Sequence, residues 1–176
     1  MWLVAITRGM AAGLAGAVAM SVTEKIEQAY TRRPDSHVPA RTLERLLGLP
    51  ERPGKQPYGW NLAMHFGQGT LMGGVRGLQA AAGLRGPWAS SMFLVVRLTS
   101  DQILENATAV GAPPWTWPRR ELVVDLLHKS VYAFVTGIVA DRLVGRLTPG
   151  PGRVHAMMRP GRRSGVGPPP RPSGAG

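Results

Sequence analysis

Four long apolar segments dominate the chain, and polar connections separate them. They cover residues 2–22, 60–84, 88–110 and 122–145. Each segment is close to the ~20 residues that an α-helix needs to cross the hydrocarbon core of a bilayer. Apolar and small residues continue most of the way round each predicted helix, and charged residues are confined to narrow stripes. This pattern predicts an all-α fold, an integral membrane four-helix bundle.

A soluble four-helix bundle is the competing interpretation, because every segment contains charged residues and the mean hydropathy is only −0.05. The helices of a soluble bundle would show an apolar stripe opposite a broad charged face. Here the proportions are reversed, which favours the membrane. Aromatic residues also flank the segments, as in the belts at membrane interfaces. They are Trp2, Tyr58, Trp60, Trp88, Trp115 and Trp117.

The first segment contains Ala17-Val18-Ala19, a pattern similar to a signal-peptidase cleavage site. A signal peptide places its positive charge before its apolar run. Here an apolar stretch precedes Arg8, and a weakly hydrophobic run rich in glycine and alanine follows it. This order favours a first helix that is retained.

The connection between the first and second segments contains a shorter helical pattern at residues 40–49. Leu43, Leu46 and Leu47 recur there at helical spacing, with prolines on either side. Two interpretations stay open. The piece is either an amphipathic helix that lies on the membrane surface, or a loop helix packed against the end of the bundle.

The composition changes near residue 149, where Pro, Gly and Arg replace most of the apolar residues. A segment of this kind cannot bury enough apolar surface to fold. We therefore expect a four-helix transmembrane domain, 1–148, and a disordered Pro/Gly/Arg-rich tail, 149–176. The arginines of the tail are suited to anionic lipid headgroups.

The chain carries 21 Lys and Arg residues against 10 Asp and Glu residues, a formal net charge of +11. The basic residues gather in 25–55 and from Arg142 onward, and they form no single stripe with interleaved aromatics. This distribution disfavours nucleic acid as a partner and suits a multi-pass membrane protein. The absence of cysteine excludes disulfides and thiolate metal sites. A homo-oligomer is compatible with these features.

Small residues recur at every fourth position on two of the predicted helices. The first has Gly9 and Gly13, and the second has Gly69, Gly73 and Gly77. Hydrophobic force does not drive helices together inside a bilayer, so close packing of backbones at small residues takes its place. We expect these glycines to form helix-packing contacts.

Polar residues gather at one end of the predicted bundle. If the four spans alternate in direction, the end of the first, the start of the second, the end of the third and the start of the fourth lie at one membrane face. Ionised groups exposed at mid-membrane cost at least about 2.5–3.5 kcal/mol, so these side chains must face the bundle interior. The aromatic loop 113–118 covers the cluster, and Trp60, Trp115 and Trp117 surround it. The predicted cluster consists of Glu24, Glu27, His65, Arg97, Asp101, Glu105, Glu121, Asp125, His128, Lys129 and Tyr132.

Two acid–base pairs in this cluster have i,i+4 spacing, Arg97 with Asp101 and Asp125 with Lys129. Residues at this spacing lie on one face of a helix, where opposite charges neutralise each other. We expect both acids to be buried partners of these cations, which is a purely structural interpretation of the cluster.

Two functional interpretations compete with the structural one. The first is transport of protons or a small solute, since acids and histidines inside the membrane commonly line such paths. The second is a metal-dependent membrane enzyme, because Asp125 and His128 lie one turn apart as in carboxylate-bridged di-metal bundles. The cations beside the acids count against a metal ion. The sequence therefore predicts no cofactor, and an enzyme is the less favoured interpretation.

Two motifs resemble those of the YagU-like group of small bacterial inner-membrane proteins. They are HFGQGTLMGG, at 65–74, and PPWTWPRRELVVDLLHKSVYAFVTG, at 113–137. The resemblance implies an integral membrane helical fold, in which a Gly-rich helix carries a histidine and a Pro/Trp loop leads into a helix with an acid and a histidine. The group has no established activity, so the resemblance implies none. The matching residues are His65, Gly69, Trp115, Pro118, Glu121 and His128.

Overall fold

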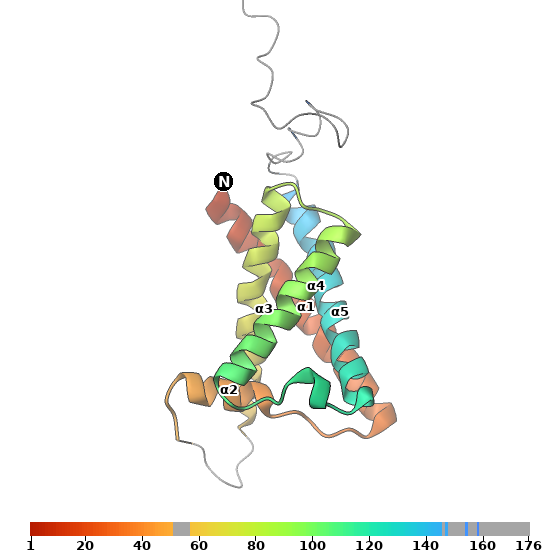
Figure 1. Cartoon of the computed structure of the whole chain (residues 1–176). Helices are drawn as coiled ribbons and strands as arrows, with labels where there is room; N and C mark the ends of the chain where they lie inside the picture. Colours follow the sequence, from red (N-terminus) through yellow and green to blue (C-terminus); the bar gives the residue numbers. More distant parts are fainter. Residues whose placement is uncertain (51–56, 146, 148–153, 155–157, 159–176) are drawn as a thin grey trace, which may run out of the picture.

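The computed structural model describes residues 1–50, 57–145, 147, 154 and 158. Over these residues the chain forms five α-helices and one 3-10 helix, with no strand among them, which confirms the predicted all-α class. Four long helices form a bundle, and the short α2 lies at one end of it (Figure 1). The elements are α1 (Trp2–Thr31), α2 (Val38–Leu46), α3 (Tyr58–Ala81), α4 (Pro87–Ala107), η1 (Pro114–Thr116) and α5 (Arg119–Val144).

Proline marks the start of three of the four long helices. Pro87 is the first residue of α4, and Pro57 and Pro118 immediately precede α3 and α5. Proline suits these positions because its fixed φ matches the helix and its missing N–H would have no partner in the first turn. Gly83 and Gly86 have φ values of 98° and 83°, so glycine is needed where the chain reverses between α3 and α4.

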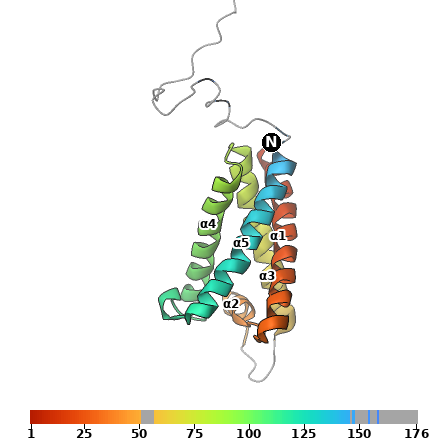
Figure 2. The same ribbon diagram turned by 90° about the vertical axis from the view of Figure 1, so that its right-hand side faces the viewer.

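The four long helices alternate in direction (Figure 1). α1 packs most extensively against α3 and then against α5, while α4 packs mainly on α5. Figure 2 shows α5 between α1 and α4. Residues 32–50, which include α2, and the α4–α5 loop lie together at the end of the bundle opposite the N-terminus (Figure 1). We call this end the α2 end.

Glycines bring α1 and α3 into backbone contact. Gly9 and Gly13 on α1 lie against Gly73 and Gly77 on α3. A Cβ atom on Gly13 would lie 2.7 Å from the Cα atom of Gly73, closer than real side chains come to a backbone. Gly69 has more room, because its Cβ would meet a side-chain carbon at 3.0 Å. The two helices therefore pack through small residues, a type of contact common between helices in bilayers.

The interior of the bundle contains charged side chains among very small ones. Most of its buried residues are alanine and glycine, joined by Phe93 and Tyr132. Arg76 heads the fully buried side chains by volume, and Arg97 and Asp101 are each only 4% exposed. Charged residues are almost never fully buried in soluble proteins unless they are paired. The core is therefore unusually polar for its size.

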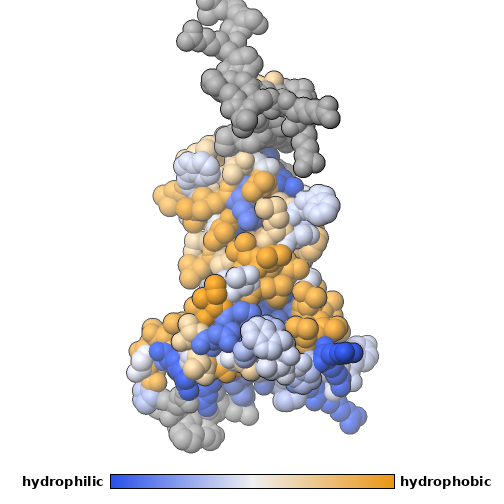
Figure 3. All heavy atoms as spheres, in the orientation of Figure 1, coloured by the Kyte–Doolittle hydropathy of each residue, from blue (hydrophilic) through white to orange (hydrophobic). Residues whose placement is uncertain are grey.

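Large apolar side chains, in contrast, point outward from the long helices. Leu71 on α3 is 67% exposed, Val95 on α4 62% and Val123 on α5 64%. Figure 3 shows apolar residues over much of the length of the bundle and hydrophilic residues gathered at the α2 end. Extended apolar surface of this kind marks contact with lipid or with another protein.

Two helices, α1 and α5, are long and apolar enough to cross a membrane. α3 and α4, which correspond to the other two predicted spans, do not meet that criterion of length and composition. Charged residues account for the difference in α4, which contains Arg97, Asp101 and Glu105. Four membrane spans therefore remain a proposal.

Two leucines at the end of α2 are exposed, and Leu43 is half-buried. Glu44 is buried against the neighbouring helices, whereas Leu46 and Leu47 are exposed. The Arg45 guanidinium donates a hydrogen bond to the main-chain oxygen of Thr108 at 2.9 Å, which ties α2 to the end of α4. The helix packs on the bundle, as the second interpretation expects. Its contact with a membrane surface stays a prediction.

The predicted tail, 149–176, lies outside the described residues except at Val154 and Met158. Three predictions are therefore untested: that the tail is disordered, that it contacts lipid headgroups, and that the domain ends at residue 148.

Candidate functional site

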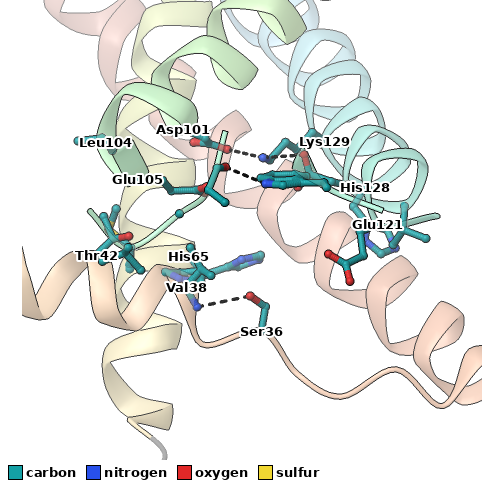
Figure 4. Close-up of a pocket in the computed structure, with 18 of the residues that line it drawn as sticks. Ser36, Val38, Thr42, His65, Asp101, Leu104, Glu105, Glu121, His128 and Lys129 are labelled. Carbon is teal, nitrogen blue, oxygen red and sulfur yellow. Dashed lines mark hydrogen bonds and ion pairs between the residues drawn. The ribbon is translucent and has the colours of Figure 1, made fainter. Parts of the chain in front are cut away.

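A cavity of about 490 Å³ lies at the α2 end of the bundle. All five α-helices contribute to its walls, and η1 and the residues around it contribute as well. Figure 4 shows polar side chains from several of these helices facing the same space. A cavity of this size is in the range of sites that hold small molecules.

The alternating helices bring most of the predicted cluster to this cavity. Two predicted members lie elsewhere. Glu27 pairs with Arg33, and Tyr132 is buried one turn deeper on α5 than His128. The members that line the cavity are Glu24, His65, Arg97, Asp101, Glu105, Glu121, Asp125, His128 and Lys129.

Asp101 is the centre of the charged network. Its Oδ2 atom lies 3.1 Å from Nζ of Lys129, and its Oδ1 accepts a hydrogen bond from the Gln68 amide at 2.8 Å. Nη1 of Arg97 is 3.3 Å from the same Oδ1, an ion-pair distance, although the N–H geometry makes no hydrogen bond. One buried carboxylate is therefore held by residues of α3, α4 and α5.

Both i,i+4 pairs expected from the sequence are present in the structure. Lys129 lies 2.9 Å from Asp125 as well as near Asp101, so one ammonium group serves two carboxylates. The two acids differ in burial, because the Asp125 side chain is 29% exposed and the Asp101 side chain only 5%. The expectation that Asp125 is buried is therefore wrong in degree. Asp125 lies one turn closer to the α2 end than Lys129 does.

Tyr132 and Arg97 form the layer below this network. The Tyr132 hydroxyl donates a 2.6 Å hydrogen bond to the main-chain oxygen of Gly69, which fixes α5 against the Gly-rich part of α3. The Arg97 guanidinium carbon lies 5.2 Å from the centroid of the Tyr132 ring, within cation–π range. The positive charge of Arg97 is thus shared between an aromatic face and Asp101.

Other cavity groups have no such partners. The carboxylates of Glu105 and Glu121 make no hydrogen bond or ion pair within the described residues. Nε2 of His128 is buried and also lacks a hydrogen-bond partner there. His65 differs, because its Nε2 lies 2.9 Å from Oγ of Ser21. Buried polar atoms normally find a partner in the protein or in water.

The outer edge of the cavity combines an ion pair with an aromatic loop. Arg33 lies 3.5 Å from Glu24 and 3.1 Å from Glu27, so it serves both acids of α1. The indole N–H of Trp117 donates to the main-chain oxygen of Ala112 at 2.7 Å, which holds the loop 113–118 over the site.

The three tryptophans expected at the interface have different roles. Trp60 and Trp115 are exposed at the α2 end, as residues of an aromatic belt would be. Trp117 instead lines the cavity. The loop that carries two of them therefore has an outer aromatic face and an inner one.

The metal interpretation gains no support from the geometry. No group of three or more His, Asp or Glu side chains is placed to hold a metal ion in the part of the chain that the structure describes. Asp125, one of the two suggested ligands, has its carboxylate in contact with Lys129.

A second buried ion pair lies at the opposite end of the bundle, and the predicted site does not include it. Nη2 of Arg76 on α3 is 2.7 Å from Oδ1 of Asp141 on α5, and Oδ2 of Asp141 accepts a hydrogen bond from the Gly86 N–H at 2.8 Å. The signal was available in the sequence. Arg76 lies on the polar stripe of its helix, and alternating helices place the ends of the second and fourth segments together.

Comparisons with known proteins give no further information. No family model, curated protein or solved structure matches the chain. The resemblance to the YagU-like group therefore stays a proposal that rests on its two motifs.

Proposed function

We propose that the chain is a multi-pass protein of the bacterial inner membrane, in which α1, α3, α4 and α5 all cross the bilayer. The distribution of side chains supports this proposal. α4 has low hydropathy because it contains charged residues, and α3 because it combines Arg76 with glycines, glutamines and His65. The charged groups Arg76, Arg97 and Asp101 are all buried. Lipid would meet the outward residues of these helices instead, and those are largely apolar.

Aromatic side chains at both ends of the long helices also support four spans. Trp2 and Trp88 are exposed at the end where α1 and α4 begin, and Trp60 and Trp115 are exposed at the α2 end. Tryptophan prefers the two interfaces of a bilayer, where its ring is partly in lipid and its N–H can meet water.

Extraction of membranes with carbonate tests the spans. An integral bundle stays with the membrane fraction under carbonate and high salt, and detergent is needed to release it. Recovery of the chain in the soluble fraction without detergent would overturn the four-span proposal.

The function we propose for this bundle is transport of protons or a small polar solute through the cavity at the α2 end. One observation carries this proposal. Acids, histidines and cations from four different long helices line a cavity inside a bundle whose outer surface is apolar. Ionisable groups in such positions are costly and commonly mark ion or substrate paths.

The contacts around the cavity would let an occupant influence the bundle. Asp101 on α4 and Lys129 on α5 join two helices directly. A proton or ligand that altered this pair would change how α4 packs on α5. At the opposite end Arg76 and Asp141 join α3 to α5, and a transport cycle would have to open that contact.

Flux measurements in proteoliposomes test transport. Vesicles that contain a pH-sensitive dye report proton entry under an imposed potassium diffusion potential, and the same vesicles report uptake of radiolabelled solute. Flux above that of protein-free vesicles, reduced in Glu105→Gln, would support the proposal. Absence of proton flux and of solute uptake in correctly folded protein would overturn it and leave a structural role for the cluster.

A further inference from the structure

The charges that line the cavity do not balance. Carboxylates outnumber cationic side chains, and histidine adds further acceptor capacity when it is neutral. A site with excess negative charge favours a positively charged occupant. The acids are Glu24, Asp101, Glu105, Glu121 and Asp125, and the cations are Arg33, Arg97 and Lys129.

The cations in the cavity are already in use. Arg97 and Lys129 contact Asp101, and Lys129 also contacts Asp125. Arg33 is likewise shared, between Glu24 and a second acid outside the cavity. The negative charge that stays uncompensated is therefore carried by the remaining two lining acids, Glu105 and Glu121.

A separate observation also points to an occupant. Three side chains in the cavity lining are more than nine-tenths buried and have a polar atom without a hydrogen-bond partner. Arg97 is 4% exposed with Nε and Nη1 unpartnered, but its charge lies beside Asp101. The other two are neutral groups: His128 is 7% exposed with Nε2 unpartnered, and Thr42 is 1% exposed with Oγ1 unpartnered. Figure 4 shows His128 and Thr42 around the same space as Glu105 and Glu121. A neutral imidazole nitrogen and a hydroxyl oxygen both accept hydrogen bonds, so the site offers acceptors to a donor.

We infer that the cavity binds a small organic cation with N–H donors, of the guanidinium or primary ammonium class, among Glu105, Glu121, His128 and Thr42. The inference rests on the proposed function and names the class of its solute. Charge-assisted hydrogen bonds from such a cation would satisfy the free carboxylates and the orphaned acceptors together. Trp117 supplies an aromatic face in the same lining, which suits a cation as well.

Other classes of occupant fit less well. A metal ion would need a set of ligands that the described residues do not assemble. An anion would have to compete with Asp101 for Arg97 and Lys129, and it would meet Glu105 and Glu121 without a counter-charge.

Isothermal titration of the full-length protein in detergent tests the inference with a matched set of probes. Methylguanidinium is permanently charged and carries several N–H donors. Methylurea has a similar planar shape and N–H donors without the charge, tetramethylammonium has the charge without the donors, and acetate has the opposite charge. We expect methylguanidinium to bind at least about tenfold more tightly than each of the other three.

Variants identify the residues that bind the cation. Glu105→Gln and His128→Gln should each weaken methylguanidinium binding by about tenfold. Asp35→Asn is the matched control, because Asp35 is at the same end of the bundle but does not line the cavity. Lys25 donates a hydrogen bond to Asp35 and lowers the pKa of its carboxyl, so the substitution removes a full charge at neutral pH. Asp35→Asn should leave binding unchanged. Glu121→Gln, at an exposed position, provides a cavity variant that should fold normally.

The outcomes separate the inference from the proposed function. Equal affinity for methylurea, a preference for acetate, or equal loss of binding in Asp35→Asn and Glu105→Gln would overturn the cation site. Proton flux without methylguanidinium binding would overturn the inference and leave the transport proposal standing. Methylguanidinium binding without any flux would support the ligand class and overturn transport.

Discussion

Nζ of Lys129 on α5 lies 3.1 Å from Oδ2 of Asp101 on α4, and this contact joins two helices through buried charges. Sequence spacing alone pairs Lys129 with Asp125, its neighbour one turn earlier. The structure adds the second carboxylate, which is far more buried than the first. The stability of the site therefore depends on the contact between helices more than on the pair within α5.

The first prediction follows from this difference in burial. Asp101→Asn would leave Arg97 and Lys129 without their shared buried carboxylate, and breaking such a contact typically costs about 3–5 kcal/mol. Asp125→Asn leaves Lys129 with Asp101, so we expect a cost of about 1 kcal/mol or less. Thermal denaturation in detergent measures both.

A double-mutant cycle identifies the partner. Lys129→Gln should be less damaging in the Asp101→Asn background than in the wild type, because the two substitutions remove the same contact. A larger loss of stability in Asp125→Asn than in Asp101→Asn would show that the pair within α5 dominates.

The second prediction concerns the contact between α1 and α3. Gly73→Leu should destabilise the fold by about 3 kcal/mol or more, since its side chain would meet the backbone of α1. Gly69→Leu should cost less, because a Cβ there would lie 3.0 Å from the Cβ of Ala17 and 3.8 Å from the main-chain oxygen of Gly13, whereas a Cβ at Gly73 would lie 2.5 Å from the Cα of Gly13.

Gly67 on the same helix supplies the control. A Cβ atom at Gly67 would meet nothing within 4 Å, so Gly67→Leu should leave stability unchanged or raise it slightly through helix propensity. Equal melting temperatures in detergent for Gly67→Leu and Gly73→Leu would contradict close packing at these glycines.

The four long helices could be predicted because apolar length is a property of the sequence itself. The ends of the helices were less accessible. The first apolar segment ends at Val22, and the predicted cluster continues the helix to Glu27, whereas α1 ends at Thr31. Residues 23–31 are polar but form helix readily, so a limit set by hydropathy marks where the apolar run stops and not where the helix ends.

The candidate site was predictable in outline for a geometric reason. Alternating helices place the polar ends of α1, α3, α4 and α5 together, whatever their exact tilt. Contacts between particular residues of different helices need the rotation and spacing of each helix, which periodicity leaves open. This is why the i,i+4 pair of Lys129 with Asp125 could be expected, whereas its contact with Asp101 could not. For Arg76 and Asp141 the sequence indicates a shared end of the bundle but not the contact itself.

The third prediction concerns that second pair, at the end opposite the cavity. Asp141→Asn would leave the fully buried guanidinium of Arg76 without its counter-charge, so we expect a loss of about 3–5 kcal/mol. Arg142→Gln, at the next and exposed position, should change stability by less than about 0.5 kcal/mol. Melting temperatures in detergent measure the two variants side by side, and similar values would mean that the Arg76 contact contributes little.

The last prediction places α2 at the membrane surface. Leu46 and Leu47 are 51% and 55% exposed, while Glu44 is buried against the bundle, so the described part of the protein leaves these two leucines largely uncovered. Full burial of a leucine side chain is worth about 1.5–3 kcal/mol, and the interfacial region of a bilayer would recover part of this.

The chain contains no cysteine, so a single introduced cysteine can be labelled without a background. An environment-sensitive fluorophore at Leu47→Cys, in protein reconstituted into vesicles, should show blue-shifted emission and quenching by brominated lipids. The same label at Asp35→Cys, in the exposed connection before α2, should show neither effect. Identical spectra at the two positions would mean that α2 faces water and that its leucines meet no lipid.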